Sequence, residues 1–286
     1  MNLKPLLIKS LQAAIEAGTA ILEIYRSDFS IEEKADNSPL TLADKRSHDV
    51  ISHYLSEFKI PILSEEGKSI PYEERRAWDT FWLVDPLDGT KEFIKKNGEF
   101  TVNIAIVRKR RPHAGVICIP DKKVIYFAAE NIGAYRIEVD KITSILNAEV
   151  KKSRNHQLAE LLRNVTDQAQ RLPIPRALSS AYKIIGSRSH ATPELEMFVQ
   201  EKRLEYGSVQ FISAGSSLKF CLVAEGKADI YPRLGLTMEW DTAAGQAVVE
   251  NAGGRVLGYE TNEPLIYNKK NLLNPWFIVS REAGNK

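Results

Sequence analysis

The chain contains little cysteine and no long apolar run. Cys118 and Cys221 are its two cysteines, and both stand in apolar surroundings. Two such residues cannot build a disulfide framework, so we expect reduced core cysteines in an intracellular protein. No apolar stretch approaches the roughly 20 residues of a membrane span, and residues 1–7 lack the sustained apolar core of a signal peptide. We therefore expect a cytoplasmic protein without a transmembrane segment, with peripheral association at the cytoplasmic face of the inner membrane left open.

An excess of charge of one sign is also absent. The 39 Lys and Arg residues nearly balance the 37 Asp and Glu residues, which gives a formal net charge of +2. No global basic field therefore points to a nucleic-acid polymer as partner. The five histidines are scattered without the spacing of zinc ligands, so zinc is disfavoured. What the chain does have is length, because 286 residues, 43% of them hydrophobic, can bury a substantial core.

The segment 82–90 carries the first candidate site. The apolar run 81–84 predicts a buried strand, and the acidic turn Asp85-Pro86-Leu87-Asp88-Gly89 follows it directly. Proline fixes one backbone angle and glycine permits a sharp reversal, so the two aspartates can converge with the Leu87 carbonyl between them. Such a cluster of anions is costly unless a cation occupies it, and a set of oxygen ligands favours a hard ion such as Mg²⁺.

The residues after this turn suit a phosphate. Gly89, Thr90 and Lys91 are expected to begin a helix, whose first N–H groups have no partners within the helix. Metal and phosphate would then lie side by side. The same residue types also form ordinary turns followed by a helix cap, and this alternative stays open for the segment taken alone.

Periodicity predicts an α+β first half, 1–140, and a layered α/β second half, 141–286. The boundary is placed in the polar region 141–175. Helices are expected at 7–25, 41–58, 193–199, 218–225 and 242–250, and strands at 29–31, 81–84, 102–106, 116–119, 124–127, 182–185, 210–212 and 228–231. Thr41 is expected to cap the second helix, with Asp44 three residues later. The polar stretch 68–76 is expected to be a surface loop or short solvated helix without a function, and the basic run 108–111 a hairpin tip.

Two distant segments, together with the acidic turn, resemble a known family. Ser64-Glu65-Glu66-Gly67 follows a short apolar run, and Trp240-Asp241-Thr242-Ala243-Ala244-Gly245 opens a helix of small residues. In residue type, order and approximate spacing, the three stretches resemble the inositol monophosphatase superfamily of Mg²⁺-dependent, lithium-sensitive phosphatases. The flanks resemble its CysQ branch, the 3'(2'),5'-bisphosphate nucleotidases, at Gly186-Ser187-Arg188-Ser189-His190, Gly215-Ser216-Ser217-Leu218-Lys219 and Tyr231-Pro232-Arg233. Leu236 departs from the pattern, which has proline there, and this puts only a local loop shape in doubt.

The resemblance implies a fold and a metal site. The fold would be a layered α-β-α-β-α sandwich of the α/β (α+β) class. Glu65, Asp85 and the Leu87 carbonyl would hold one Mg²⁺, and Asp85, Asp88 and Asp241 another, with two or three ions in all. Water activated by the metal would attack phosphorus directly, with Thr90 as its hydrogen-bond partner and Glu65 or Asp44 relaying the proton. For Asp44, a helix-capping role is the alternative.

The same resemblance suggests how a nucleotide would be held. The metal ligands, including Leu87, would contact the phosphate that is cleaved, and the Gly89 and Thr90 amides would cradle it. The nucleoside and a second phosphate need further contacts, for which the candidates are Ser187, Arg188, His190, Lys219 and Arg233. Arg188 is the preferred guanidinium fork for the second phosphate.

The implied activity is hydrolysis of the 3'-phosphate of adenosine 3',5'-bisphosphate to AMP and phosphate. 3'-Phosphoadenylyl sulfate is a further expected substrate, and sulfur assimilation is the expected setting. An inositol monophosphatase or sugar phosphatase is the alternative, since it could share every metal ligand. A catalytically silent metal-binding or interaction protein that retains the fold is a second rival, which the intact ligand positions disfavour. We expect a monomer or a homodimer.

Overall fold

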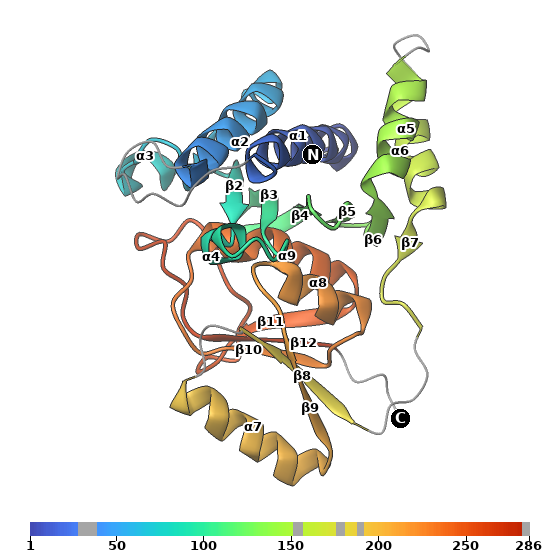
Figure 1. Cartoon of the computed structure of the whole chain (residues 1–286). Helices are drawn as coiled ribbons and strands as arrows, with labels where there is room; N and C mark the ends of the chain where they lie inside the picture. Colours follow the sequence, from blue (N-terminus) through green and yellow to red (C-terminus); the bar gives the residue numbers. More distant parts are fainter. Residues whose placement is uncertain (28–38, 151–156, 176–180, 188–191, 282–286) are drawn as a thin grey trace.

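The computed structural model describes residues 1–27, 39–150, 157–175, 181–187 and 192–281. In this part of the chain, helices and sheets alternate in five layers (Figure 1). One outer layer consists of the helices α1 (Leu3–Tyr25), α2 (Pro39–Leu55), α5 (Val139–Val150) and α6 (Gln157–Gln168). Their apolar residues share one core with one face of the first sheet.

The first sheet contains its strands in chain order. These are β1 (Ile62–Ser64), β2 (Thr80–Asp88), β3 (Thr101–Arg108), β4 (Arg111–Ile119), β5 (Val124–Ala129), β6 (Gly133–Glu138) and β7 (Gln170–Arg171). β1 runs parallel to β2, and each later pair is antiparallel. Ile104 belongs to the core under α1, whereas its neighbour Ala105 belongs to the core on the other face. Both faces of the sheet are therefore buried, which explains its continuous apolar runs.

The second core packs the first sheet against α8 (Leu218–Glu225) and α9 (Glu239–Asn251) and these against the second sheet. The second sheet has the order β11 (Gly254–Gly258), β12 (Phe277–Arg281), β10 (Ile230–Arg233), β8 (Tyr182–Gly186) and β9 (Val209–Ser213). α7 (Pro193–Tyr206) covers its outer face. The expected α-β-α-β-α sandwich is confirmed (Figure 1).

Small residues bring α9 close to the first sheet. A Cβ added at Gly115 of β4 would lie 2.6 Å from the Ala244 carbonyl oxygen, so no larger residue fits there. Ala243, Ala244 and Ala247 of the helix are buried in the same core. This close packing places the first turn of α9, which contains Asp241, beside the first sheet.

Several local expectations need correction. β2 does not end at residue 84 but continues to Asp88, with a register shift between Asp85 and Asp88. Thr41 is not an N-cap, because α2 already begins at Pro39. The stretch 68–76 is not uniformly solvated, because α3 (Tyr72–Arg75) ends in a buried arginine. The expected hairpin tip is confirmed by two residues of positive φ, Lys109 and Arg110, between β3 and β4.

Two expectations remain as predictions. The strand expected at 29–31 lies outside the described residues. The division into halves at residue 140 also stays a prediction. The first sheet gains its last strand, β7, only at residues 170–171. No helix in the described ranges is both long enough and apolar enough to cross a lipid bilayer.

Candidate metal and substrate site

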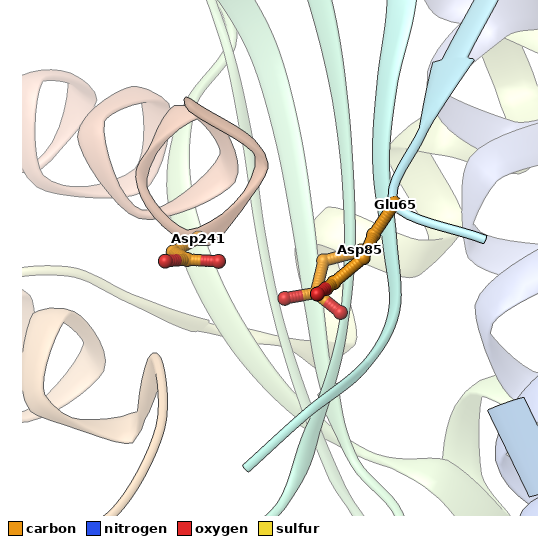
Figure 2. Close-up of side chains that lie close together, drawn as sticks. All are labelled: Glu65, Asp85 and Asp241. Carbon is orange, nitrogen blue, oxygen red and sulfur yellow. The ribbon is translucent and has the colours of Figure 1, made fainter. Parts of the chain in front are cut away.

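Three carboxylates from three elements converge at one edge of the first sheet. Glu65 follows β1 directly, Asp85 lies in the parallel neighbour β2, and Asp241 lies in the first turn of α9. Each offers an oxygen atom, and these atoms lie within 4.8 Å of one another. Figure 2 shows the Glu65 and Asp85 side chains together, with Asp241 facing them from the helix. The parallel pairing of β1 with β2 explains why Glu65 lies beside Asp85, since Ser64 is paired with Val84 and these two residues directly follow that pair.

Burial and mutual repulsion make this cluster costly without a cation. Asp85 is 1% exposed, and burial, followed by the charges of Asp88 and Glu65, raises its pKa well above the usual range. Burial is also the first cause that raises the pKa of Glu65 and of Asp241 to about 7 each. The pKa of Asp44 rises to about 8, through burial and the charges of Glu66 and Glu65. An all-oxygen anionic set of this kind fits a hard divalent ion such as Mg²⁺.

One carboxylate oxygen of Asp88 is occupied by hydrogen bonds. Its Oδ2 accepts the Ser217 backbone N–H at 2.7 Å and weaker bonds from Thr101 (3.3 Å) and Asn103 (3.4 Å). It stands outside the group of three mutually close carboxylates, although its charge raises the pKa of all three. Ligation of a metal by Asp88 therefore stays a prediction.

The acidic turn is fixed by its own hydrogen bonds. The Leu87 amide donates to Asp85 Oδ1 at 3.1 Å, and the Leu87 side chain is buried in the core. Ser47 of α2 donates to the Pro86 carbonyl at 2.7 Å. Gly89, with φ +99°, then begins α4 (Thr90–Ile94), as expected. Thr90 is exposed. The roles assigned to the Leu87 carbonyl and the Thr90 hydroxyl stay predictions.

A pocket of about 120 Å³ extends from Asp241 toward the second sheet. It brings together predicted residues from both halves of the chain. Its walls include Asp88, Gly89, Ser187, Ser217, Lys219, Tyr231, Arg233 and Asp241. Arg188 and His190, predicted for the same region, lie outside the described residues.

The basic side of this pocket is formed by Lys219 and Arg233. Lys219 is buried, its Nζ donates to the Ser216 carbonyl at 2.8 Å, and burial lowers its pKa to about 8. Arg233 donates from Nη2 to the Leu236 carbonyl at 2.8 Å. Its Nε is buried and has no partner among the described residues, which is an unusual cost for a guanidinium. The Arg233 side chain also lines the pocket, where its positive charge would pair with a bound anion.

The residues that hold the acidic groups in place carry no signal in the sequence pattern. Ser217 is 1% exposed, donates from Oγ to the Asp241 carbonyl at 2.9 Å and accepts the Asn103 amide at 3.0 Å. Glu239, also fully buried, anchors the start of α9. Ser217 lies in the motif 215–219, which stands out only by family resemblance, and Glu239 directly precedes the motif 240–245. In neither case does residue spacing reveal the contact.

Known proteins resemble this chain over nearly its whole length. The model of the inositol monophosphatase family matches residues 2–281. The 3'(2'),5'-bisphosphate nucleotidase CysQ of Shigella flexneri is 42% identical over 276 residues, covering 94% of this chain and 97% of the relative. The protein of the same name from Haemophilus influenzae is 31% identical over 277 residues, covering 96% of this chain and 92% of the relative.

Solved structures agree with these matches. The crystal structure of CysQ from Bacteroides thetaiotaomicron, a bacterial member of the inositol monophosphatase family, is 46% identical and has a TM-score of 0.87, covering 98% of both chains. The inositol monophosphatase II of Staphylococcus aureus has a TM-score of 0.70, covering 97% of this chain and 89% of that one, but is only 22% identical and therefore shows the fold alone.

Proposed function

Because the chain belongs to the inositol monophosphatase family, we propose that it is a metal-dependent 3'(2'),5'-bisphosphate nucleotidase. It hydrolyses the 3'-phosphate of adenosine 3',5'-bisphosphate to give AMP and phosphate. The observation that carries this proposal is a pocket with two kinds of charge. Asp88 and Asp241 lie at its acidic end, and the cationic side chains of Lys219 and Arg233 line the same pocket. A substrate with two separate phosphates needs an anchor for each of them.

Glu65, Asp85 and Asp241 would hold the cation, which we propose to be Mg²⁺, with two or three ions in the complete site. When bound, Mg²⁺ neutralises the phosphate charge and lowers the pKa of water. The carboxylates themselves serve as a rigid frame. Asp85 is held by the Leu87 amide and Asp241 by the Met238 amide, so neither needs reordering when substrate enters.

The reaction itself is a direct displacement by water. Water forms the new bond to phosphorus, and the bond from phosphorus to the ribose 3'-oxygen breaks. A Glu65 or Asp44 carboxylate oxygen accepts the proton from water, and the departing oxygen takes up a proton from solvent. The Thr90 hydroxyl orients the water. The Gly89 and Thr90 amides at the start of α4 cradle the transferred group, and Arg233 or Arg188 binds the second phosphate.

Phosphate release tests the proposal. Purified protein with Mg²⁺ is expected to hydrolyse adenosine 3',5'-bisphosphate at least about tenfold more efficiently, in kcat/KM, than inositol 1-phosphate. Removal of metal by a chelator and the variant Asp85→Asn serve as inactive controls. A preference for inositol 1-phosphate would assign the protein to the inositol monophosphatases. No turnover of either substrate would identify a catalytically silent member of the family.

Sensitivity to lithium is a further part of this proposal. Lithium at millimolar concentration is expected to inhibit, since it resembles Mg²⁺ in size but carries half its charge. Rates that stay constant through a lithium titration at limiting Mg²⁺ and fixed ionic strength would contradict this.

We further propose 3'-phosphoadenylyl sulfate as a second substrate and a role in sulfur assimilation in the cytoplasm. Its hydrolysis in the same assay tests the second substrate.

A further inference from the structure

A second buried polar cluster lies at the start of α9. Its centre is Glu239, the first residue of the helix, whose side chain has no exposed surface. The carboxylate accepts the backbone N–H groups of Asn268 at 2.6 Å and Lys269 at 2.9 Å, together with the Lys269 ammonium group at 2.7 Å. Three donors on one buried carboxylate fix its orientation and bind segment 268–269 to the helix.

Arg75 holds the same segment from α3. Its side chain is 3% exposed, and Nη1 donates to Asn268 Oδ1 at 2.8 Å and to the Lys269 carbonyl at 2.7 Å. Nη2 donates to the Lys270 carbonyl at 3.0 Å, and the Asn268 amide donates back to the Arg75 carbonyl at 2.7 Å. α3 follows the loop that begins at Glu65. Arg75 therefore links the chain that follows Glu65 to segment 268–269, which is itself bound to α9.

A continuous series of contacts connects this segment to Asp241. Lys269 Nζ also donates to Asn274 Oδ1 at 3.3 Å. The buried Asn274 amide donates to the Met238 carbonyl at 2.7 Å, and the Met238 N–H donates to Asp241 Oδ2 at 2.8 Å. Each member of the series is held by the next, so the position of the Asp241 carboxylate depends on segment 268–274 as well as on its own helix.

We propose that Glu239 and Arg75 are positioning residues that hold Asp241 at the distance from Glu65 and Asp85 that a divalent cation requires. The inference rests on the proposed metal-dependent function. Glu239 lies two residues before Asp241 but points its carboxylate at segment 268–269 instead of the cluster. Mg²⁺ demands nearly ideal octahedral geometry, so a ligand that must be ordered on binding weakens the site. Loss of such an outer partner typically weakens metal binding 10–100-fold.

The variant Glu239→Gln tests this most directly. Glutamine has the same shape. Its NH₂ group, however, would face one of the three groups that now donate hydrogen bonds to the carboxylate, and two donors cannot pair. We expect the Kd for Mg²⁺ to rise about 10–100-fold. The measurement is calorimetric titration of the metal-free full-length protein with Mg²⁺. At saturating Mg²⁺, kcat should recover to within about threefold of wild type, because the variant changes occupancy rather than chemistry.

Glu250→Gln is the matched control. Glu250 lies on the same helix, is half-buried and accepts a hydrogen bond from Gln246 at 2.8 Å. It is nine residues beyond Asp241, about 14 Å along the helix axis. Its substitution is expected to leave the Kd for Mg²⁺ unchanged. An equal rise in both variants would mean that general loosening of the helix weakens binding, and would overturn the inference.

Arg75→Lys supplies a second, independent variant. Lysine keeps the charge but cannot serve three acceptors as a planar fork, so we expect a Kd for Mg²⁺ about 3–10-fold higher. If Glu239→Gln does not fold, this variant carries the test. Wild-type affinity in the folded variants would overturn the proposal. A wild-type protein that binds no Mg²⁺ would instead overturn the proposed function, on which the inference rests.

Discussion

At the scale of single residues, the carboxylates of the acidic cluster repel one another, and a bound cation would relieve this repulsion. Asp85 is buried among other carboxylates, and among the described residues no lysine or arginine forms a salt bridge with it. Such an arrangement destabilises the metal-free protein when the carboxylates are ionised. The raised pKa values of Asp44, Glu65, Asp85 and Asp241 therefore predict a pH dependence.

We expect the metal-free protein to lose stability as pH rises from about 5 to 8. The unfolded chain ionises its carboxyl groups near pH 4, whereas the folded cluster keeps protons up to about pH 7–8, so the free energy of unfolding falls as pH rises through this interval. Because one pKa unit corresponds to about 1.4 kcal/mol, the shifts of the partly buried Asp44 and Asp241 amount to several kcal/mol, and we expect a Tm at least about 5 °C lower at pH 8 than at pH 5. Thermal unfolding in chelator measures it. Lys219, with its pKa lowered to about 8, raises stability only above this interval.

Asp85→Asn provides the control for the pH experiment, since it removes one anion from the centre of the cluster. Its metal-free Tm should depend less on pH than that of the wild type. A wild-type Tm that stays level or rises between pH 5 and 8 would contradict the raised pKa values.

Asp88→Asn is expected to separate catalysis from folding. The amide oxygen can replace Oδ2 as acceptor for Ser217, Thr101 and Asn103, so Tm should change by less than about 2 °C. Turnover at saturating Mg²⁺ should fall at least about 100-fold, because a predicted ligand of the ion that neutralises the reacting phosphate is lost. Asp88→Ala leaves the three donors without their acceptor and should lower Tm as well. Near-normal turnover of Asp88→Asn would remove Asp88 from the site.

At the scale of elements, the connection from β9 to α8 joins the two sides of the site. Ser216 Oγ donates to the Asp88 carbonyl at 2.9 Å, while Ser217 binds Asp88 Oδ2 through its N–H and the Asp241 carbonyl through its Oγ. Lys219 holds the Ser216 carbonyl from α8. The end of β2, the start of α8 and the start of α9 are thus fixed to one another by a single loop.

Gly89→Ala is expected to disturb this junction more than an ordinary glycine substitution does. At φ +99°, alanine is strained, and its methyl group would also collide with Ser216 Oγ. Gly207, with φ +72° and no atom within 4 Å of an added Cβ, provides a control with strain alone. Gly207→Ala should cost about 1–2 kcal/mol, and Gly89→Ala about 1–3 kcal/mol more, together with most activity. Chemical denaturation measures both. Equal costs would show that the loop yields easily to the new methyl group.

At the scale of the whole molecule, the site is assembled from different layers. Glu65 and Asp85 come from the first sheet, Asp241 from the middle helices and Arg233 from the second sheet. A cation shared by Asp85 and Asp241 would cross-link the first sheet to α9 (Figure 1). Binding should therefore stabilise the protein as a unit, and not only the local loops.

The Tm at pH 8 is accordingly expected to rise with the logarithm of Mg²⁺ concentration. At 100 times the Kd, the gain is about 2.7 kcal/mol, or about 5–10 °C. Scanning calorimetry over a Mg²⁺ series measures it, with Asp241→Asn as a variant whose Tm should respond less. A wild-type Tm that stays constant from metal-free conditions to 10 mM Mg²⁺ would exclude a cation that joins the layers.

Much of the architecture could be predicted from sequence, because each element is locally consistent. The helical spacing at 7–25 and the alternation at 102–106 match α1 and β3, since both have apolar residues in the period that their structure requires. The helix α2 begins two residues before the predicted start at 41, because Thr41 resembles a cap but is already preceded by helical residues. Capping residues indicate helix starts only when the preceding backbone is extended.

By itself, the sequence determined the chemistry of this protein: an acidic turn after a buried strand, two further acidic motifs in a familiar order, and a core large enough for layered sheets. Tertiary structure alone decided which side chains meet. Periodicity places a residue on a strand or a helix face, but not beside a partner 100 or more residues away. The contacts of Ser217 with Asp88 and of Arg75 with Asn268 span 129 and 193 positions. Such contacts depend on how closely the layers pack, as at Gly115 and Ala244, and no local pattern records that distance.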